Sequence, residues 1–357
     1  MSMQNPKFSL NTYYNKAVGT KYFHHKHPFR LENGAELPEL QIAYHTYGTL
    51  NENASNVVWV CHAFSANADV ADWWSGMVGQ EHFLNPDKYF IVCANIIGSC
   101  YGSSGPVSLN PKTNEPYFID FPLVTVRDMV NAHELLRQHL GLEKIYVGIG
   151  GSLGGHQLME WAILQPDLFE SIVLISTSAK HSAWGIAYNE AQRMAIYADP
   201  TWQERRFEAG QNGLKAARAV ALLSYRNYDT YVKAQTEPTD DKIDNFKASS
   251  YQQYQGVKLI KRFNVLAYIA LSKAMDSHNV SRGRGSLTEV LGSIKARTLV
   301  IGVSSDYLFP VVEQKLLAEL IPNAIYTEID SGYGHDGFLV EIEKVGKLLS
   351  NFFVPMK

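Results

Sequence analysis

The stretch GIGGSLGGHQ, residues 148–157, places five glycines around a single serine. It follows the apolar run KIYV, residues 144–147, which is typical of a buried strand, and it precedes LMEWAIL, residues 158–164, which is typical of a helix. A strand that passes into a helix through so flexible a turn has three well-known uses. They are a phosphate-binding loop, a dinucleotide-binding turn, and a serine presented as a nucleophile.

The residue spacing distinguishes these three uses. A phosphate-binding loop requires GxxxxGK followed by serine or threonine, but His156 occupies the lysine position. A dinucleotide-binding turn requires GxGxxG, but its third glycine would fall on Leu153. The nucleophile-elbow pattern GxSxG fits, with Ser152 between Gly150 and Gly154. A purely structural turn is the alternative, because short glycine patterns arise by chance, and the strand before and the helix after Ser152 favour the elbow.

A serine nucleophile of this kind requires an acid and then a histidine later in the chain. The predicted strand 298–303 is followed by Asp306, and the segment 325–330 leads into His335 in a loop of small residues. Taken singly, Asp306 could be a helix cap and His335 a solvated loop histidine. Their order after Ser152 and their positions beyond strand ends predict a catalytic triad of Ser152, Asp306 and His335.

The reaction of such a serine also needs backbone N–H groups that bind the developing oxyanion. One donor should be Leu153, the residue after the nucleophile, and the other should lie in a loop after an earlier strand. The strand that ends at His62 continues into AFS, residues 63–65, and we predict the N–H of Phe64 as the second donor. Loss of one such donor usually lowers the rate about 10²–10³-fold.

Short apolar runs rich in valine, isoleucine and aromatic residues recur along the chain and predict buried strands. They are residues 57–62, 89–94, 145–149, 172–175 and 298–303. Helical patterns such as residues 126–140 separate several of them, which predicts an α/β fold with a mostly parallel sheet flanked by helices. The alternating stretch 37–47 suggests an antiparallel edge strand.

The strand signal disappears between residues 183 and 285, where several helices are predicted instead. They include residues 183–197, 214–225 and 259–275. A helical block of this length inside an α/β pattern predicts a lid inserted over residues 183–285. The sheet domain is then formed by residues 1–182 and 286–357.

The composition is that of an ordinary globular protein, with 357 residues, 46% hydrophobic and 19% charged. The formal net charge of −3 advertises no surface for nucleic acid, and no apolar run approaches the ~18 residues of a membrane span. Three cysteines without a CxxC pair suit a reducing compartment, and the first 14 residues lack the pattern of a signal peptide. We therefore expect a soluble, intracellular protein that binds neither membranes nor nucleic acid.

Two further clusters are weighed and set aside. The histidine-rich segment HHKH, residues 24–27, has no carboxylate or cysteine nearby, so no metal site is expected there. Cys100 lies in a glycine-rich loop without an elbow or a base of its own, so it is not expected to be a nucleophile.

Several longer motifs carry a resemblance that goes beyond the fold class. They are HAFS at 62–65, GSCYGSSGP at 98–106, DFP at 120–122, TVRDMV at 125–130, RGRG at 282–285, DYLFP at 306–310 and GHDGF at 334–338. Together with the elbow, they resemble the homoserine O-acetyltransferase family from about residue 25 to the end of the chain. The resemblance implies an α/β-hydrolase fold with a helical lid. It also implies transfer of acetyl from acetyl-CoA to the side-chain hydroxyl of L-homoserine, in methionine biosynthesis.

By the same resemblance, Ser152 is the residue that becomes acetylated, His335 is the general base and acid, and Asp306 orients His335. Acetyl-CoA is then a co-substrate, and no cofactor is expected. The resemblance further implies a homodimer in the cytoplasm. Arg282 and Arg284 could contact the phosphates of CoA or only brace the lid.

An amino-acid substrate requires a fixed cation for its carboxylate and a fixed anion for its ammonium group. Arg218 precedes Tyr225 by seven residues, so both lie on one face of the predicted helix. The resemblance implies that Arg218 holds the homoserine carboxylate with Tyr225 nearby. It also implies that Asp336 holds the ammonium group and that Ser65 lines the substrate site. The alternatives are a surface charge for Arg218 and, for Asp336, a rival orienter of His335, for which a residue adjacent in sequence is badly placed.

Leu308 bears on the acyl donor, because succinyl-preferring relatives of the family place an arginine at this position. Without that cation, acetyl is favoured over succinyl. A serine hydrolase or esterase on the same triad and a non-catalytic binding protein of the same fold remain alternatives. The pairing of Arg218 with Asp336 argues against an esterase of simple esters, and the complete triad argues against a non-catalytic protein. L-Serine stays open as acceptor, since one methylene in a pocket is worth only about 1–3 kcal/mol.

Overall fold

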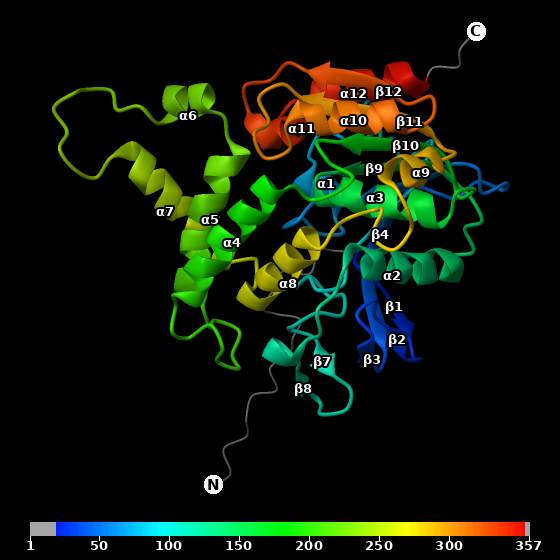
Figure 1. Ribbon diagram of the computed structural model, residues 1–357, viewed down its shortest axis with the longest axis horizontal. Coiled ribbons are helices and arrows are strands. Elements are labelled where there is room, and N and C mark those ends of the chain that lie inside the picture. The colour runs from blue at the N-terminus through cyan, green and yellow to red at the C-terminus, as the bar shows by residue number, and fades with distance from the viewer. Residues whose placement is uncertain (1–18, 354–357) are drawn as a thin grey trace.

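The centre of the protein is an eight-stranded sheet in the order β1-β4-β6-β5-β9-β10-β11-β12 (Figure 1). The computed structural model describes residues 19–353, so the first 14 residues, which lack a signal-peptide pattern, lie outside the described part. The strands are β1 Lys21–His25, β4 Leu40–Tyr47, β5 Val57–Cys61, β6 Phe90–Ala94, β9 Ile145–Gly151, β10 Phe169–Ile175, β11 Arg297–Val303 and β12 Ile325–Ile329. The six strands from β6 to β12 in this order are parallel, and β4 is antiparallel to both of its neighbours.

The five predicted buried strands are all present, with bounds that shift by a few residues at most. The prediction of an edge strand at 37–47 is wrong in part. β4 is antiparallel, but it pairs with β1 on one side and with β6 on the other. Glu36–Leu37 separates as β3 and pairs with β2, Phe29–Arg30. Pro38 accounts for the separation, because it has no N–H to continue a strand ladder.

The central strands of the sheet are buried on both sides, because helices cover both of its faces. The core on one face includes side chains from α2 Val126–His139, α3 Leu153–Leu164, α9 Leu287–Gly292 and α10 Val311–Leu320. The core on the other face includes side chains from α1 Val70–Trp73 and α12 Ile342–Phe353. The short elements are η1 Phe118–Asp120, η2 Gly334–Asp336, α11 Gly337–Val340, and a hairpin of β7 Leu109–Asn110 with β8 Glu115–Pro116.

Of the six helices between β10 and β11, five form a group beside the sheet. They are α4 Ala183–Tyr197, α5 Gln211–Tyr225, α6 Tyr228–Gln235, α7 Lys247–Ile260 and α8 Val265–Asp276. Of this group, α4 to α7 project to the left in Figure 1. α4 packs against α5 and α8, and α5 packs against α7. We refer to this group of helices as the lid.

The single helix predicted over residues 259–275 is wrong. α7 ends at Ile260, and a short connection precedes α8. Asn264 closes this connection, because its side-chain oxygen accepts hydrogen bonds from the N–H groups of Leu266 and Ala267. The asparagine therefore starts a second helix instead of continuing the first, and the break places Arg262 outside both helices.

An ion-pair network ties the end of the lid insertion to the sheet domain. Glu160 is buried in α3, and its carboxylate lies 2.8 Å from Arg127 and 2.5 Å from Arg284. Glu32 pairs with Arg127 at 2.8 Å and with Arg282 at 2.7 Å. Of the two roles considered for Arg282 and Arg284, the structure shows both side chains bracing the lid junction.

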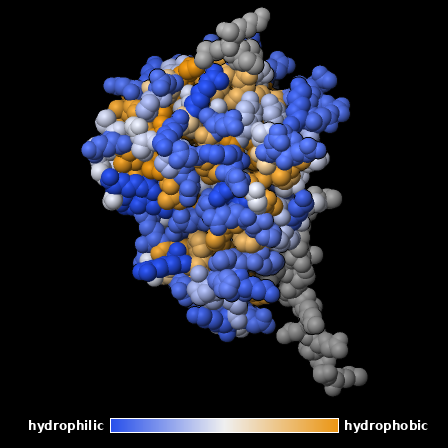
Figure 2. Space-filling model, turned by 90° about the vertical axis from the view of Figure 1, so that its right-hand side faces the viewer, coloured by the Kyte–Doolittle hydropathy of each residue, from blue (hydrophilic) through white to orange (hydrophobic). Residues whose placement is uncertain are grey.

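Several exposed apolar side chains lie on α5, α6, α7 and the loop between α6 and α7. We call this set the apolar lid surface: Leu223, Tyr228, Val232, Ile243, Tyr254 and Val257. By contrast, hydrophilic residues cover most of the sheet-domain face seen in Figure 2, with apolar residues in small patches. Within residues 19–353, no helix is long and apolar enough to cross a bilayer.

The cysteines Cys61, Cys93 and Cys100 are free thiols, and all three are buried. Burial raises the pKa of each thiol, that of Cys100 to about 12. A thiol that stays protonated is a poor nucleophile, which agrees with the sequence argument against a catalytic Cys100.

Candidate active site

Ser152 occupies a strained turn between β9 and α3. Its backbone has φ 54° and ψ −125°, a conformation that costs free energy for a residue other than glycine. The turn fits only because its neighbours are small. A Cβ on Gly150 would lie 2.2 Å from the carbonyl oxygen of Gly154, and a Cβ on Gly154 would lie 2.0 Å from that of Cys61. The elbow therefore holds the serine side chain clear of the sheet, at the N-terminus of α3.

The parallel strands bring the other predicted residues to the same edge of the sheet. β5 ends at Cys61 and runs into the loop 63–65, β11 ends three residues before Asp306, and β12 ends six residues before His335. Since the carboxyl ends of parallel strands share one edge, residues far apart in the sequence converge around Ser152.

Asp306 and His335 form a buried hydrogen-bonded pair. The Nδ1–H of His335 donates to Oδ2 of Asp306 at 2.7 Å. The other carboxylate oxygen, Oδ1, accepts the N–H groups of Leu308 and Phe309, both at 2.9 Å. The carboxylate is thus fixed from both sides, and the Nε2 of His335 is left as the basic nitrogen.

Two opposing effects act on the pKa of His335. Burial lowers the pKa, whereas the charge and hydrogen bond of Asp306 raise it, with a smaller contribution from the charge of Asp336. The carboxylates prevail, and the pKa lies above the ordinary value of 6.5. A base of this strength suits removal of a proton from a serine near neutral pH.

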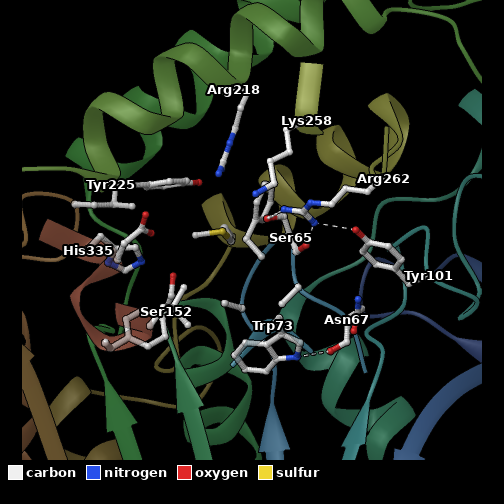
Figure 3. A pocket seen from close by; sticks show the side chains of 18 of the residues that line it. Ser65, Asn67, Trp73, Tyr101, Ser152, Arg218, Tyr225, Lys258, Arg262 and His335 are labelled. Carbon is white, nitrogen blue, oxygen red and sulfur yellow. Dashed lines mark hydrogen bonds between the residues drawn. The ribbon is translucent and has the colours of Figure 1, made fainter. Parts of the chain in front are cut away.

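A pocket of about 670 Å³ opens over Ser152 and His335. Figure 3 shows the hydroxyl of Ser152 below the ring of His335, with both side chains facing the cavity. The pocket is lined by eight of the residues predicted from the sequence: Phe64, Ser65, Ser152, Arg218, Tyr225, Leu308, His335 and Asp336. The two others, Asp306 and Leu153, are buried behind this lining.

The two candidate oxyanion donors come from different elements, the start of α3 and the loop after β5. The N–H of Leu153 is the first of α3, and the first N–H groups of a helix have no acceptor within that helix. Phe64 lines the pocket from the loop after β5, and its ring packs edge-on against Tyr268 of the lid at 4.7 Å. Both residues can therefore present a backbone donor near Ser152.

Arg218 and Asp336 place opposite charges in the pocket. Arg218 points from α5 toward the cavity (Figure 3), and its guanidinium lies 5.5 Å from the ring centre of Tyr225. The ring of Tyr225 in turn lies 5.9 Å from that of His335. Asp336 pairs with Arg226 at 3.3 Å, a partner that the sequence reasoning did not identify.

The sequence reasoning missed several other pocket residues. They include Tyr101, Asn189, Gln192, Lys258 and Arg262. Lys258 lies on α7 and Arg262 in the connection before α8, and no local pattern in the sequence indicates that both side chains reach the pocket. Among residues 19–353, no group of three or more His, Cys, Asp or Glu side chains is arranged to hold a metal ion.

An α/β sheet with a serine elbow after β9, and with an acid and a histidine after β11 and β12, defines the α/β-hydrolase class. A model of the alpha/beta hydrolase fold family accordingly matches residues 56–342. The chain belongs to the homoserine O-acetyltransferase family. It is 46% identical over 354 residues to homoserine O-acetyltransferase of Cyclobacterium marinum, and the alignment covers 99% of each chain.

Solved structures show the same relationship. The homoserine O-acetyltransferase of Bacillus anthracis superimposes with a TM-score of 0.87 at 25% identity, covering 93% of this chain and 96% of that one. An acetylester hydrolase of Corynebacterium glutamicum superimposes with a TM-score of 0.84 at 25% identity, covering 94% and 95%. The architecture is thus shared by a transferase and a hydrolase, and the acceptor must be argued from the site.

Proposed function

We propose that this protein transfers acetyl from acetyl-CoA to the side-chain hydroxyl of L-homoserine through an acetyl-Ser152 intermediate. The observation that carries the proposal is the position of Arg218 and Asp336 in the pocket above Ser152. A fixed cation and a fixed anion match the carboxylate and ammonium of an amino acid. Membership in the homoserine O-acetyltransferase family supports homoserine as that amino acid.

In the first half-reaction, Nε2 of His335 takes the proton from Oγ of Ser152 as the oxygen attacks the thioester carbonyl of acetyl-CoA. The N–H groups of Leu153 and Phe64 bind the oxyanion that forms on the carbonyl oxygen. The C–S bond then breaks, and the departing CoA sulfur receives the proton from His335. Acetyl-Ser152 remains, and His335 is neutral again.

In the second half-reaction, Arg218 holds the carboxylate of homoserine and Asp336 its ammonium group, with Tyr225 and Ser65 beside them. His335 takes the proton from the homoserine hydroxyl, whose oxygen attacks the acetyl carbonyl. The bond to Oγ of Ser152 breaks, and Ser152 recovers its proton from His335. O-acetylhomoserine leaves, which fits a place in methionine biosynthesis, and the lid excludes water that would otherwise compete.

Two further features belong to the proposal. Leu308 is buried at the pocket wall, where it offers no cation to a succinyl carboxylate, and this supports acetyl as the acyl group. The apolar lid surface supports a homodimer through the lid, because Ile243 is 95% exposed and Tyr228 is 75% exposed in the single chain. Sedimentation velocity should give twice the mass of one chain, and a stable monomer would contradict the dimer.

A hydrolase is the second candidate, favoured by the structural similarity to the acetylester hydrolase of Corynebacterium glutamicum. In that case water, and not an amino acid, would release the acetyl group from Ser152. The presence of Arg218 in the pocket argues against it, because a simple ester offers no carboxylate to this guanidinium.

The deciding experiment measures free CoA thiol released from acetyl-CoA with L-homoserine, with L-serine and without an amino acid. Fast release with homoserine alone is expected. Equal release in all three reactions would establish water as the acceptor, and faster release with L-serine would change the acceptor. Succinyl-CoA in place of acetyl-CoA should react slowly. The variant Ser152→Ala should lose turnover in every reaction and should form no acyl-enzyme.

A further inference from the structure

The loop 63–65, which carries the candidate donor Phe64, is held from the sheet side by His62. The backbone N–H of Ile96 donates to Nε2 of His62 at 3.2 Å, so the ring proton must lie on Nδ1. Nδ1–H then donates to the carbonyl oxygen of Ala63 at 2.9 Å. The same oxygen also accepts the N–H of Ala66 at 3.1 Å.

These contacts fix the direction of the Phe64 N–H. The carbonyl of Ala63 and the N–H of Phe64 belong to the same peptide group, and in a trans peptide the two bonds point in opposite directions. With the carbonyl held against His62, the N–H of Phe64 is directed away from the sheet. Rotation of this one peptide group would remove the donor from the site.

The loop is held from the opposite side by the lid. Nη1 of Arg262 donates to the carbonyl oxygen of Ser65 at 2.5 Å and to the hydroxyl of Tyr101 at 2.8 Å, and Nη2 donates to Oγ of Ser65 at 3.3 Å. Figure 3 shows the Arg262 side chain reaching from the lid toward Ser65 and Tyr101. Within residues 19–353, no carboxylate forms an ion pair with Arg262, so its hydrogen bonds go to neutral oxygens of this region.

Aromatic packing also holds the loop 63–65 against the lid. The ring of Phe64 stacks on Phe263, the residue after Arg262, with 6.3 Å between ring centres, and it meets Tyr268 of α8 edge-on at 4.7 Å. Phe263 also packs against Tyr101 at 5.7 Å. The connection between α7 and α8 therefore contacts both the side chain of Phe64 and the backbone of the next residue.

From these contacts we propose that Arg262 is a positioning residue for the oxyanion hole. It holds the carbonyl of Ser65 while His62 holds that of Ala63, so the Phe64 N–H between them keeps its direction. The oxyanion hole is then complete only when the break between α7 and α8 is seated on the sheet domain. This inference rests on the proposed function in one respect, the role of the Phe64 N–H as an oxyanion donor.

A different role for Arg262 would be to bind the phosphates of CoA as a pocket cation. The two roles differ in their dependence on the acyl donor. A positioning residue acts on every acyl transfer to Ser152, including transfer from an acetyl ester without phosphates. A phosphate-binding residue acts only on acetyl-CoA, mainly through its KM.

The test compares the rate of Ser152 acetylation from acetyl-CoA and from p-nitrophenyl acetate in Arg262→Gln, Arg262→Lys and the parent protein. Arg262→Gln should slow acetylation by both donors about 10–100-fold, because the Phe64 donor is misdirected but not removed. The KM for acetyl-CoA should change little, and Arg262→Lys should recover part of the rate. Lys261→Gln is the matched control, since Lys261 is the exposed neighbouring cation, and it should leave both rates unchanged.

Two results would overturn the inference: unchanged acetylation by both donors, or a loss confined to acetyl-CoA and to its KM. If Arg262→Gln does not fold, Arg262→Lys and Tyr101→Phe decide the question, each with a smaller loss that is equal for both donors. The parent protein is measured first with acetyl-CoA alone. Absence of an acyl-enzyme from acetyl-CoA would contradict the proposed function itself, and not the role of Arg262.

Discussion

His335 combines burial with a raised pKa, and Asp306 is the reason. Burial alone favours the neutral imidazole, whereas the carboxylate 2.7 Å away favours the charged one and prevails. The proposed mechanism needs the neutral form as base. Activity should therefore be lost as the pH falls through a pKa above 6.5.

The pH dependence of kcat/KM for acetyl-CoA tests this residue. The acid limb should lie above pH 6.5 in the parent protein. In Asp306→Asn the raising effect is removed and burial remains, so the limb should move to lower pH while the maximal rate falls about 10⁴-fold. A limb that stays in place in Asp306→Asn would assign the titration to another group.

Among single residues, the sequence predicts those whose role depends on their order along the chain. Ser152, Asp306 and His335 could be predicted because an elbow, an acid and a histidine must follow parallel strands in that order. Arg226 and Arg262 could not, because their contacts depend on how the lid folds back over the sheet. No local pattern specifies which surface a lid residue will meet.

The first turn of α3, which follows β9, packs against the end of β5 with almost no free space. Gly154 lies in the first turn of α3, where a Cβ would meet the carbonyl of Cys61 at the end of β5. The backbone of α3 therefore lies in direct contact with the backbone at the end of β5. The same strand end leads into His62 and the oxyanion loop, so a change in this spacing reaches the site.

Gly154→Ala should cost roughly 1–3 kcal/mol of unfolding free energy through overpacking and should also slow Ser152 acetylation. Gly346→Ala is the matched control, because Gly346 lies inside α12 with nothing within 4 Å of the added Cβ. It should stabilise the protein by about 0.5–1 kcal/mol through helix propensity. Urea unfolding measures both changes, and equal effects of the two variants would refute the close approach.

Elements were predictable where periodicity and length agreed, as in the strands and in α2. The break between α7 and α8 was not, because apolar residues lie on both sides of residues 261–264 and the cap formed by Asn264 is the local feature that starts α8. The sequence predicts an edge strand at β4, because no local pattern indicates that β1 pairs on its outer side. Local patterns define an element, whereas its neighbours are decided by the whole fold.

Among residues 19–353, six histidines are buried and have a lowered pKa: His45, His62, His133, His156, His181 and His278. Burial lowers the pKa of each, to about 4 for His62 and His181 and to about 3 for His133 and His278. In the unfolded chain these groups take up protons near pH 6.5. Between pH 6.5 and about 4 the unfolded state thus binds more protons, so stability must fall as the pH falls.

The melting temperature should therefore decrease from pH 7.5 to pH 5, with each histidine adding at most about 1.4 kcal/mol per pH unit. His335, with its raised pKa, acts in the opposite direction, but it is one group against six. His133 packs between Trp59 and Trp161, and both of its ring nitrogens lack partners. His133→Leu should make the pH dependence shallower, whatever its effect at pH 7.5. An unchanged slope would mean that His133 is protonated in the folded state.

The burial of the three cysteines has a practical consequence for following this molecule. A thiol reagent added to the native protein should find nothing to label, so a signal during turnover would report the released CoA alone. Once the chain unfolds, Cys61, Cys93 and Cys100 become reactive together. One reagent can then measure CoA release while the protein is folded and the rate of unfolding when the protein is denatured.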